Sequence, residues 1–441
     1  MSKLTRRQML RNGSLAGIAL WTTCKVSGAE PAASQNEKLN IAGIGVGGRG
    51  AADVNGCSHE NIVALCDVDE RRAAATLDKF PQAKKYKDFR KMLAEMEKQI
   101  DAVVIGTPDH THAAPGVMAM KMGKHCYCEK PLTHSVHEAR VMTDIAAKNK
   151  LVTQMGTQIH AGDNYRRAVE LVQSGAIGQV AEVHVWLGAN FKGPAAPDPA
   201  DTNQPDAPTD EPPVPEGLDW DLWLGPAPYR PYHSAYCPFA WRQWWAFGNG
   251  TLGDFFCHYC DLAFWALDLK YPLTVESVGP VHPESASRWT ISRHEYPARG
   301  DKPPVKLTWY NGGPYPSLVK EKNVPEWGSA VLFVGQKGML ISDYGKHQLL
   351  PEDKYRDFER PEPFIPASLG HHREWTEACK TGGPTTCNFG YSGPLTEAAL
   401  LSNVALRVGR KLTWDPNNLK ATGCPEADAY LKRAYRDGWT L

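Results

Sequence analysis

The sequence has no long apolar run and no excess of charge of either sign. Its 49 lysine and arginine residues balance 49 aspartate and glutamate residues, and no basic block stands out. A nucleic-acid partner is therefore not expected, because such binding needs a concentrated positive surface. The apolar stretch at 14–21 is far shorter than the roughly 20 residues of a membrane-spanning helix, and no later run reaches that length.

Two adjacent arginines precede that short apolar stretch. Residues 5–10 read Thr-Arg-Arg-Gln-Met-Leu, and 27–29 place small residues at the −3 and −1 positions of a signal-peptidase site. We predict that 1–29 is a twin-arginine signal peptide. The mature protein is then expected in the periplasm, exported folded, without membrane insertion after cleavage. Lipidation of Cys24 stays open, although the residues before it lack the usual leucine.

Cysteine is present, with 11 residues, but in no evident disulfide framework. A chain that folds before export folds in a reducing compartment, so we expect free, buried thiols. Cys257 and Cys260 flank His258 in a Cys-x-x-Cys, but no second pair at zinc spacing follows. We predict no metal site.

Strand and helix patterns alternate up to about residue 155. The chain is too long for one hydrophobic core, so two domains are expected. Ser135 and Glu138 form a capping box that predicts a helix start. The alternation favours an α/β fold with a doubly wound parallel sheet in an N-terminal domain at 38–155. Its predicted strands are 39–44, 62–66, 102–105 and 152–155.

The second half of the chain has a different pattern. Eight prolines between 194 and 215 indicate a long irregular segment. A late helix is predicted at 395–408. The remaining strands favour a mostly antiparallel sheet in a second domain at 156–441. These strands are predicted at 305–310, 330–335 and 338–342.

A glycine-rich turn follows the first predicted strand. Residues 45–50 fit G-x-G-x-x-G, which allows a pyrophosphate to approach a helix N-terminus. Asp67 ends the next strand, where a carboxylate can accept a hydrogen bond from a ribose 2′-hydroxyl and repel a 2′-phosphate. NAD is therefore favoured, and the nearby Arg71 and Arg72 keep NADP open. A plain structural turn is the alternative. The residues predicted to contact the cofactor here are Gly45, Gly47, Gly48, Arg49, Gly50 and Asp67.

Two polar motifs lie in apolar surroundings. Lys130 follows the short apolar segment 125–128, and a lysine at the carboxyl end of a parallel strand can stabilise negative charge on a bound hydroxyl. Asp254, His258 and Asp261 lie at i, i+4 and i+7 of a mostly apolar helix, on one face. This stripe predicts either a buried network that holds the helix or a general base, His258, oriented by a neighbouring carboxylate.

These motifs, in this order and spacing, resemble the Gfo/Idh/MocA family, which includes glucose-fructose oxidoreductase and inositol dehydrogenase. The resemblance rests on the glycine turn, the segments 107–112 and 123–131, and the Asp254 to Asp261 stripe. It implies a Rossmann domain and a C-terminal α/β domain whose large open sheet forms the interface of a homo-oligomer, a dimer or tetramer. Phe255-Phe256 departs from the small residue that many relatives have, which puts the substrate class in doubt.

The resemblance also implies roles for individual residues. His258 removes a hydroxyl proton, Asp254 orients His258, and Lys130 holds the hydroxyl oxygen during reversible oxidation of a sugar, sugar derivative or cyclitol by NAD. Further cofactor contacts are implied for Thr107, Pro108, His112, Glu129 and Lys130. Substrate contacts are implied for Gln158, Trp241, Arg242 and Asp261.

Five tryptophans crowd the segment before the 254–261 stripe, with Arg242 among them. They either form core or present apolar faces to a carbohydrate. Two other functions stay open: a redox-neutral glycosidase or lyase that works through a transient keto-sugar, and a non-catalytic binding protein. Because the periplasm offers no expected nicotinamide pool, we expect the cofactor to be tightly bound.

Overall fold

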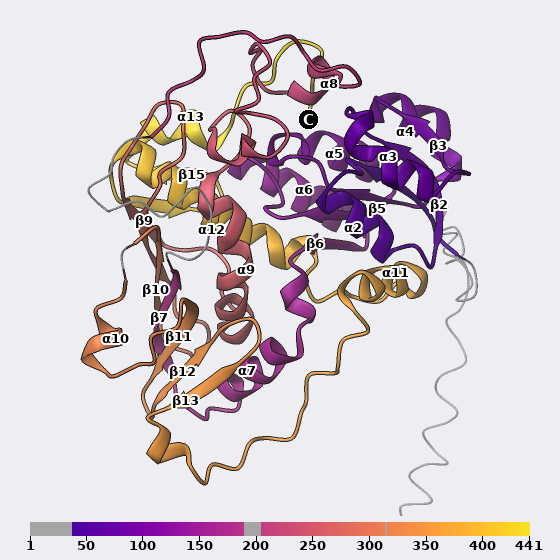
Figure 1. Ribbon diagram of the computed structural model, residues 1–441. Coiled ribbons are helices and arrows are strands. Elements are labelled where there is room, and N and C mark those ends of the chain that lie inside the picture. The colour runs from indigo at the N-terminus through magenta and orange to yellow at the C-terminus, as the bar shows by residue number, and fades with distance from the viewer. Residues whose placement is uncertain (1–37, 189–203, 314) are drawn as a thin grey trace, which may run out of the picture.

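Two sheets with helices packed on them make up the protein (Figure 1). The computed structural model describes residues 38–188, 204–313 and 315–441. The predicted export signal at 1–29 lies outside the described residues, as does part of the proline-rich segment.

The first sheet is parallel, with six strands in the order β3-β2-β1-β4-β5-β6. The strand order reverses between β1 and β4, and in such sheets ligands bind at this point, beyond the carboxyl ends of the strands. The predicted doubly wound Rossmann sheet is therefore confirmed. Its strands are β1 (Asn40–Ile44), β2 (Asn61–Cys66), β3 (Lys84–Tyr86), β4 (Ala102–Ile105), β5 (His125–Glu129) and β6 (Thr153–Gly156).

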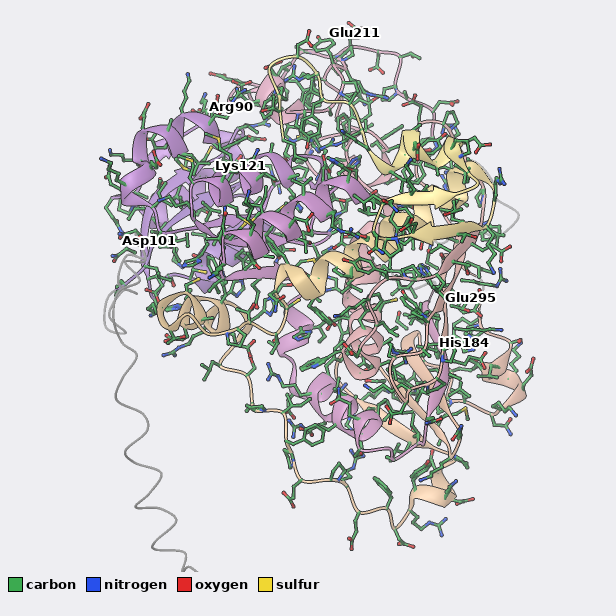
Figure 2. The ribbon with its side chains drawn as sticks, turned by 180° about the vertical axis from the view of Figure 1, so that it is seen from behind. Arg90, Asp101, Lys121, His184, Glu211 and Glu295 are labelled. Atoms are coloured by element: carbon green, nitrogen blue, oxygen red, sulfur yellow. The ribbon has the colours of Figure 1, made fainter. Side chains whose placement is uncertain are left out.

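Helices cover both faces of this sheet (Figure 1). They are α2 (Arg49–Gly56), α3 (Glu70–Lys79), α4 (Phe89–Met96), α5 (Ala113–Lys121) and α6 (Val136–Lys148), with the 3₁₀ turns η1 (Glu97–Gln99) and η2 (Asp109–Thr111). The predicted capping box opens α6, since the Ser135 hydroxyl accepts from the Glu138 N–H and the Glu138 carboxylate accepts from the Ser135 N–H. Charged side chains such as Asp101 and Lys121 line the outer surface of this domain (Figure 2).

The second sheet has nine strands in the order β13-β12-β11-β7-β10-β9-β8-β14-β15. Every neighbouring pair described is antiparallel except β7 and β10, so the mostly antiparallel sheet is confirmed. The strands are β7 (Val180–Leu187), β8 (Thr274–Val278), β9 (Thr290–Tyr296), β10 (Val305–Asn311), β11 (Ser329–Gly335), β12 (Met339–Ser342), β13 (His347–Leu350), β14 (Leu412–Asp415) and β15 (Lys420–Thr422).

Three long helices pack between the sheets: α7 (Asp163–Gln173), α9 (Gly250–Leu267) and α12 (Phe389–Val408). The last of these begins at Phe389 rather than at the predicted residue 395, because the Asn388 side chain caps it and Pro394 is accommodated inside it. Arg140 on α6 makes two hydrogen bonds of 2.9 Å to Glu397 on α12, which joins the first domain to the second.

The chain also returns to the first domain after the second sheet has begun. Helix α11 (His371–Thr381) places Trp375, which is fully buried, in the cluster around β1 and β2. Short elements complete the fold: η3 (Gln158–Ala161), α8 (Trp220–Leu224), η4 (Ala240–Gln243), α10 (Leu318–Glu321), η5 (Glu352–Tyr355), η6 (Pro425–Ala427) and α13 (Asp428–Leu431).

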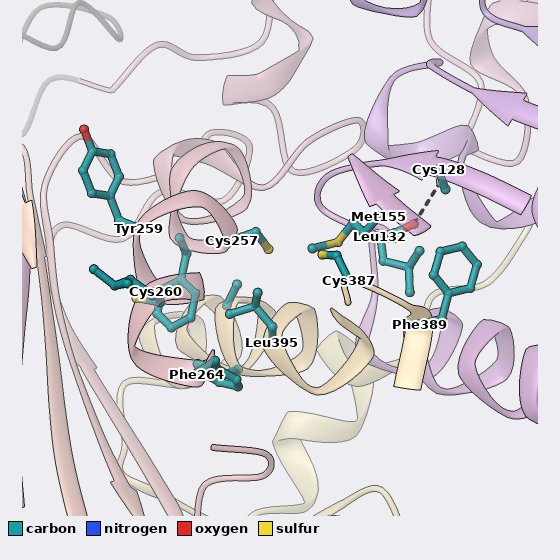
Figure 3. Close-up of a cluster of buried hydrophobic side chains, with 14 of the residues drawn as sticks. Cys128, Leu132, Met155, Cys257, Tyr259, Cys260, Phe264, Cys387, Phe389 and Leu395 are labelled. Atoms are coloured by element: carbon teal, nitrogen blue, oxygen red, sulfur yellow. Dashed lines mark hydrogen bonds between the residues drawn. The ribbon is translucent and has the colours of Figure 1, made fainter. Parts of the chain in front are cut away.

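The ten cysteines in the described part of the chain are free, and nine of them are buried, as predicted. Figure 3 shows Cys128, Cys257, Cys260 and Cys387 among apolar side chains, where a thiol behaves as a small hydrophobic group. Across the described ranges, no helix combines the length and the apolar character needed to cross a bilayer.

Candidate active site

One cavity of about 470 Å³ lies at the carboxyl ends of β1, β4 and β5 and reaches the start of α9. The glycine turn forms one part of its wall, and Lys130, Asp254 and His258 form another. Residues far apart in the sequence thus share one cleft, as expected at the reversal point of a doubly wound sheet. Most of the predicted site residues line it: Gly45, Gly47, Gly48, Arg49, Asp67, Thr107, Pro108, Glu129, Lys130, Gln158, Trp241, Arg242, Asp254 and His258.

The glycine turn leaves room that a side chain would fill. Gly45 has a φ of 72°, and a Cβ there would lie 2.6 Å from the Thr107 side chain. A Cβ on Gly50 would lie 1.8 Å from the Gly45 carbonyl oxygen, so Gly50 permits close packing of α2 against the turn. Gly50 is not among the residues that line the cavity, and its contact with the cofactor stays a prediction. The turn fits a pyrophosphate.

Asp67 holds the turn in place. Its carboxylate accepts hydrogen bonds from the main-chain N–H groups of Val46, Gly47 and Asp69 at 2.7, 3.0 and 2.9 Å. Burial nevertheless raises the pKa of Asp67. The carboxylate also lines the cavity, as the prediction of a ribose contact requires.

His112 connects two loops of the site. It is buried, and its ring nitrogens lie 2.8 Å from the carbonyl oxygens of Thr107 and Pro131. It therefore ties the loop after β4 to the loop after β5. His112 is not among the residues that line the cavity, and its direct contact with the cofactor stays a prediction.

Lys130 and Asp254 form an ion pair in the cavity wall. The Lys130 ammonium donates to the Asp254 carboxylate and, at 2.7 Å, to the Asp254 main-chain carbonyl oxygen. The Arg242 guanidinium lies 3.5 Å from the same carboxylate. Burial opposes ionisation, but these two cations hold the pKa of Asp254 below its ordinary value. An ammonium has three donors, so one remains for a ligand.

His258 stands apart from this pair. Among the hydrogen bonds of the described residues, none joins it to Asp254, whose carboxylate pairs with Lys130. Asp254 and His258 still interact electrostatically, and the orienting role of Asp254 stays a prediction. The His258 main chain is held by Tyr165, whose hydroxyl donates to the His258 carbonyl oxygen at 3.2 Å. Burial and the charge of Lys130 lower the pKa of His258 to about 3, so the ring is neutral at neutral pH.

A buried network surrounds Glu129. Its carboxylate accepts from the Gln158 amide at 2.6 Å and from Arg49 at 3.1 Å. Burial, with the nearby Asp53 carboxylate, raises the pKa of Glu129 to about 7. Gln158 also donates to the Tyr127 hydroxyl at 2.8 Å. The network orients Gln158 and Arg49, which both reach the cavity.

Asp261 does not share the cleft with Asp254 and His258. It is fully buried, its carboxylate accepts from Tyr391 at 2.7 Å, and His160 lies 2.9 Å away. The predicted substrate contact is therefore wrong, and Asp261 belongs to a network that holds α9 against η3 and α12. His160, Asp261 and Cys387 place potential metal-ligand atoms within 4.8 Å of one another, but Asp261 is already hydrogen-bonded.

The aromatic residues divide between core and cleft. Trp241 lines the cavity, and the Arg242 guanidinium lies 4.2 Å from the centre of its ring. Trp223 also reaches the cavity, whereas Trp220, Trp244 and Trp245 pack in the protein interior. Three of the five tryptophans thus belong to the core and two reach the cleft, where contact with a carbohydrate stays a prediction. Phe255 narrows the cleft beside Lys130, whereas Phe256 is buried against His294 and Trp309.

Sequence reasoning missed Asp109. Its carboxylate is buried, lines the cavity and interacts electrostatically with Lys130, Arg242 and Asp254. Burial raises its pKa to about 7 against that cationic influence. The sequence did offer one indication of this role: Asp109 lies in the segment 107–112, directly beyond the carboxyl end of β4, where such sheets bind ligands.

Two family models match this chain. The model described as "Oxidoreductase family, NAD-binding Rossmann fold" matches residues 39–157, and the model of the same family's "C-terminal alpha/beta domain" matches residues 170–300. Together they cover more than half of the sequence. The chain belongs to the Gfo/Idh/MocA oxidoreductase family. Its N-terminal domain is accordingly an NAD-binding Rossmann domain.

Two curated proteins are similar to part of this chain. It is 32% identical to inositol 2-dehydrogenase of Salmonella typhimurium over 151 residues, which are 33% of this chain and 44% of that protein. It is 27% identical to a glycosyl hydrolase family 109 protein of Shewanella pealeana over 203 residues, or 40% of this chain and 44% of that protein. The match thus spans less than half the length of either relative.

A solved structure shows the same fold over most of the chain. An inositol dehydrogenase homologue of Azotobacter vinelandii, complexed with NADH and myo-inositol, superposes with a TM-score of 0.58 at 15% identity. The superposition covers 87% of this chain and 100% of that one. It supports the two-domain architecture of this family member.

Proposed function

We propose that this protein is an NAD-dependent oxidoreductase that oxidises a secondary alcohol of a sugar, sugar derivative or cyclitol and reduces the corresponding ketone. The observation that carries the proposal is the single cavity that joins the glycine turn to Lys130, Asp254 and His258. Inositol 2-dehydrogenase, which resembles the chain over 151 residues, supports the substrate class.

Lys130, Asp254 and His258 have separate roles in the proposed reaction. The free donor of Lys130 binds the substrate hydroxyl oxygen and stabilises negative charge as it develops. Asp254 positions Lys130 through its carboxylate and main-chain carbonyl oxygen. The neutral His258 ring accepts the hydroxyl proton. Bound NAD supplies the hydride acceptor for the carbon that carries the hydroxyl.

The test is a screen of the purified protein against sugars, sugar derivatives and cyclitols, with the absorbance of reduced nicotinamide as readout. A substrate that changes this absorbance in wild-type protein, but not in Lys130→Ala, supports the proposal. Tight cofactor binding but no redox change with any carbohydrate would count against net oxidation.

A second candidate is a redox-neutral glycosidase or lyase, favoured by the similarity to the family 109 glycosyl hydrolase. Transient oxidation would acidify a neighbouring C–H, and the glycosidic bond would then break by elimination. Analysis of products from a glycoside distinguishes the two: a free sugar with unchanged net redox state indicates bond cleavage, and a keto-sugar indicates net oxidation.

We further propose that residues 1–29 direct folded protein to the periplasm and that the mature chain forms a homo-oligomer. The Arg6-Arg7 pair and the small residues before position 30 support the first proposal. The nine-stranded open sheet supports the proposal of a homo-oligomer, because the family resemblance implies that such a sheet forms the interface. Light scattering of the purified protein measures the number of subunits.

A further inference from the structure

A part of the chain from outside the Rossmann domain lines one end of the nucleotide cavity. Residues 432–441, here called the return segment, follow α13 and come back to the first domain, where the chain end lies beside α8 and α5 (Figure 1). Within this segment Trp439 lines the cavity, together with Phe89 at the start of α4.

Strand order identifies which end of the cavity this is. In a Rossmann fold, the acidic residue at the end of β2 faces the ribose of the adenosine half. Asp67 lies there, and Lys87 and Phe89, which follow β3 at the sheet edge, extend the cavity wall outward from it. Trp439 therefore stands at the adenosine end, and Lys130 and His258 mark the opposite, reacting end.

The Trp439 ring is contacted by the side chains of Phe89, Arg90 and Arg436. Its centre lies 6.0 Å from that of the Phe89 ring, and the Arg90 guanidinium lies 4.4 Å from its centre. Arg90 also donates to the Gly438 carbonyl oxygen at 3.3 Å. The ring is only partly buried, because it borders the cavity.

The return segment also fastens α8 over the cavity. Arg436 donates to the Gly225 carbonyl oxygen and to the Asp221 carboxylate, both at 2.5 Å. Helix α8 has five residues, too few for a stable helix on its own, and it carries Leu222 and Trp223 to the cavity wall. The other end of the segment is tied to the first domain, with Lys121 donating to the Leu441 carbonyl oxygen at 3.2 Å.

We propose that Trp439 stacks on the adenine of the bound dinucleotide and that the return segment, by fastening α8, slows release of the cofactor. This inference rests on the proposed function, because it takes NAD as the ligand. Stacking agrees with the position of Trp439, whose partly exposed ring borders the adenosine end of the cavity. Every base has a π-face on which such a ring can stack. Leu222 supplies an apolar side chain from α8 to the same cavity.

The test compares two fragments of NAD on protein stripped of cofactor. ADP-ribose probes the adenosine half, and nicotinamide mononucleotide probes the reacting half. In Trp439→Ala we expect calorimetry to show about ten- to a hundredfold weaker binding of ADP-ribose, the range for loss of one base-stacking ring. Binding of nicotinamide mononucleotide should stay unchanged. Trp439→Phe keeps a ring and should keep most of the affinity.

A second variant tests the fastening of α8. Arg436→Ala removes the hydrogen bonds to Gly225 and Asp221 and also the guanidinium that lies 5.9 Å from the centre of the Trp439 ring. We expect NADH fluorescence to report release at least tenfold faster than from wild type, with ADP-ribose affinity that falls less than in Trp439→Ala. Unchanged ADP-ribose affinity in Trp439→Ala would overturn the stacking role, as would equal weakening of both fragments. Unchanged release from Arg436→Ala would overturn the fastening role. Wild-type protein that binds neither fragment would refute the proposed function itself.

Discussion

The ammonium group of Lys130 is hydrogen-bonded to both the carboxylate and the main-chain carbonyl oxygen of Asp254, 124 positions further along the chain. Through this contact the end of β5 meets the start of α9, and the two domains share one polar centre. The lysine is thereby fixed at the cavity wall, and its charge is balanced before a substrate arrives.

Loss of either proposed catalytic side chain should slow turnover without emptying the cofactor site. We expect Lys130→Ala and His258→Ala each to lower kcat by about two to four orders of magnitude, the range for loss of an electrostatic stabiliser or a general base. Steady-state kinetics measure kcat, and absorbance of released cofactor measures its content. Near-normal kcat in either variant would remove that residue from the mechanism.

Asp254 should act through Lys130. We expect Asp254→Asn to lower kcat in wild-type protein and to have little further effect in a Lys130→Ala background, because the contact it supports is already gone. In a His258→Ala background the effect of Asp254→Asn should persist. A cycle in which Asp254 couples to His258 and not to Lys130 would show that the carboxylate serves the histidine instead.

Asp109 should make stability depend on pH. Burial raises its pKa from 3.8 to about 7, so the folded protein holds a proton that the unfolded chain releases. The stabilisation is complete below about pH 4 and is lost as the pH rises toward 7. The Tm of Asp109→Asn minus that of wild type should therefore increase between pH 4 and 7. A constant difference would mean that Asp109 ionises normally.

The purified protein should retain its cofactor. A retention half-life of an hour requires a dissociation rate on the order of 2 × 10⁻⁴ per second, which with a typical association rate gives a sub-nanomolar Kd. We expect near-stoichiometric NAD(H) in protein purified without added cofactor, and repeated turnover without a supply. Apo protein that needs about millimolar NAD would contradict this expectation of tight binding.

Export should depend on the arginine pair. We expect Arg6→Lys/Arg7→Lys to leave folded, uncleaved precursor inside the cell, because twin-arginine recognition requires both guanidinium groups. Arg11→Lys is the matched control, since it makes the same change outside the pair. Fractionation followed by N-terminal sequencing measures the outcome. Normal export of the double variant would exclude this route.

Local patterns in the sequence determined much of the fold. Three features could be predicted because they depend only on neighbouring residues. They are the glycine turn at 45–50, the capping box at Ser135 and the position of Lys130 after β5. Strand periodicity likewise predicted the two kinds of sheet. Such features need no knowledge of how distant segments meet.

Only the tertiary structure decided the partners of the buried charged groups. Helical spacing put Asp254, His258 and Asp261 on one face. Asp261 lies about 10 Å from Asp254 along the helix axis, however, and meets His160 instead of the cavity. The partner of Asp254 and the place of Trp439 depend on contacts between segments more than a hundred residues apart. A periodicity within one helix gives the direction of a side chain, and the packing of other segments determines what it contacts.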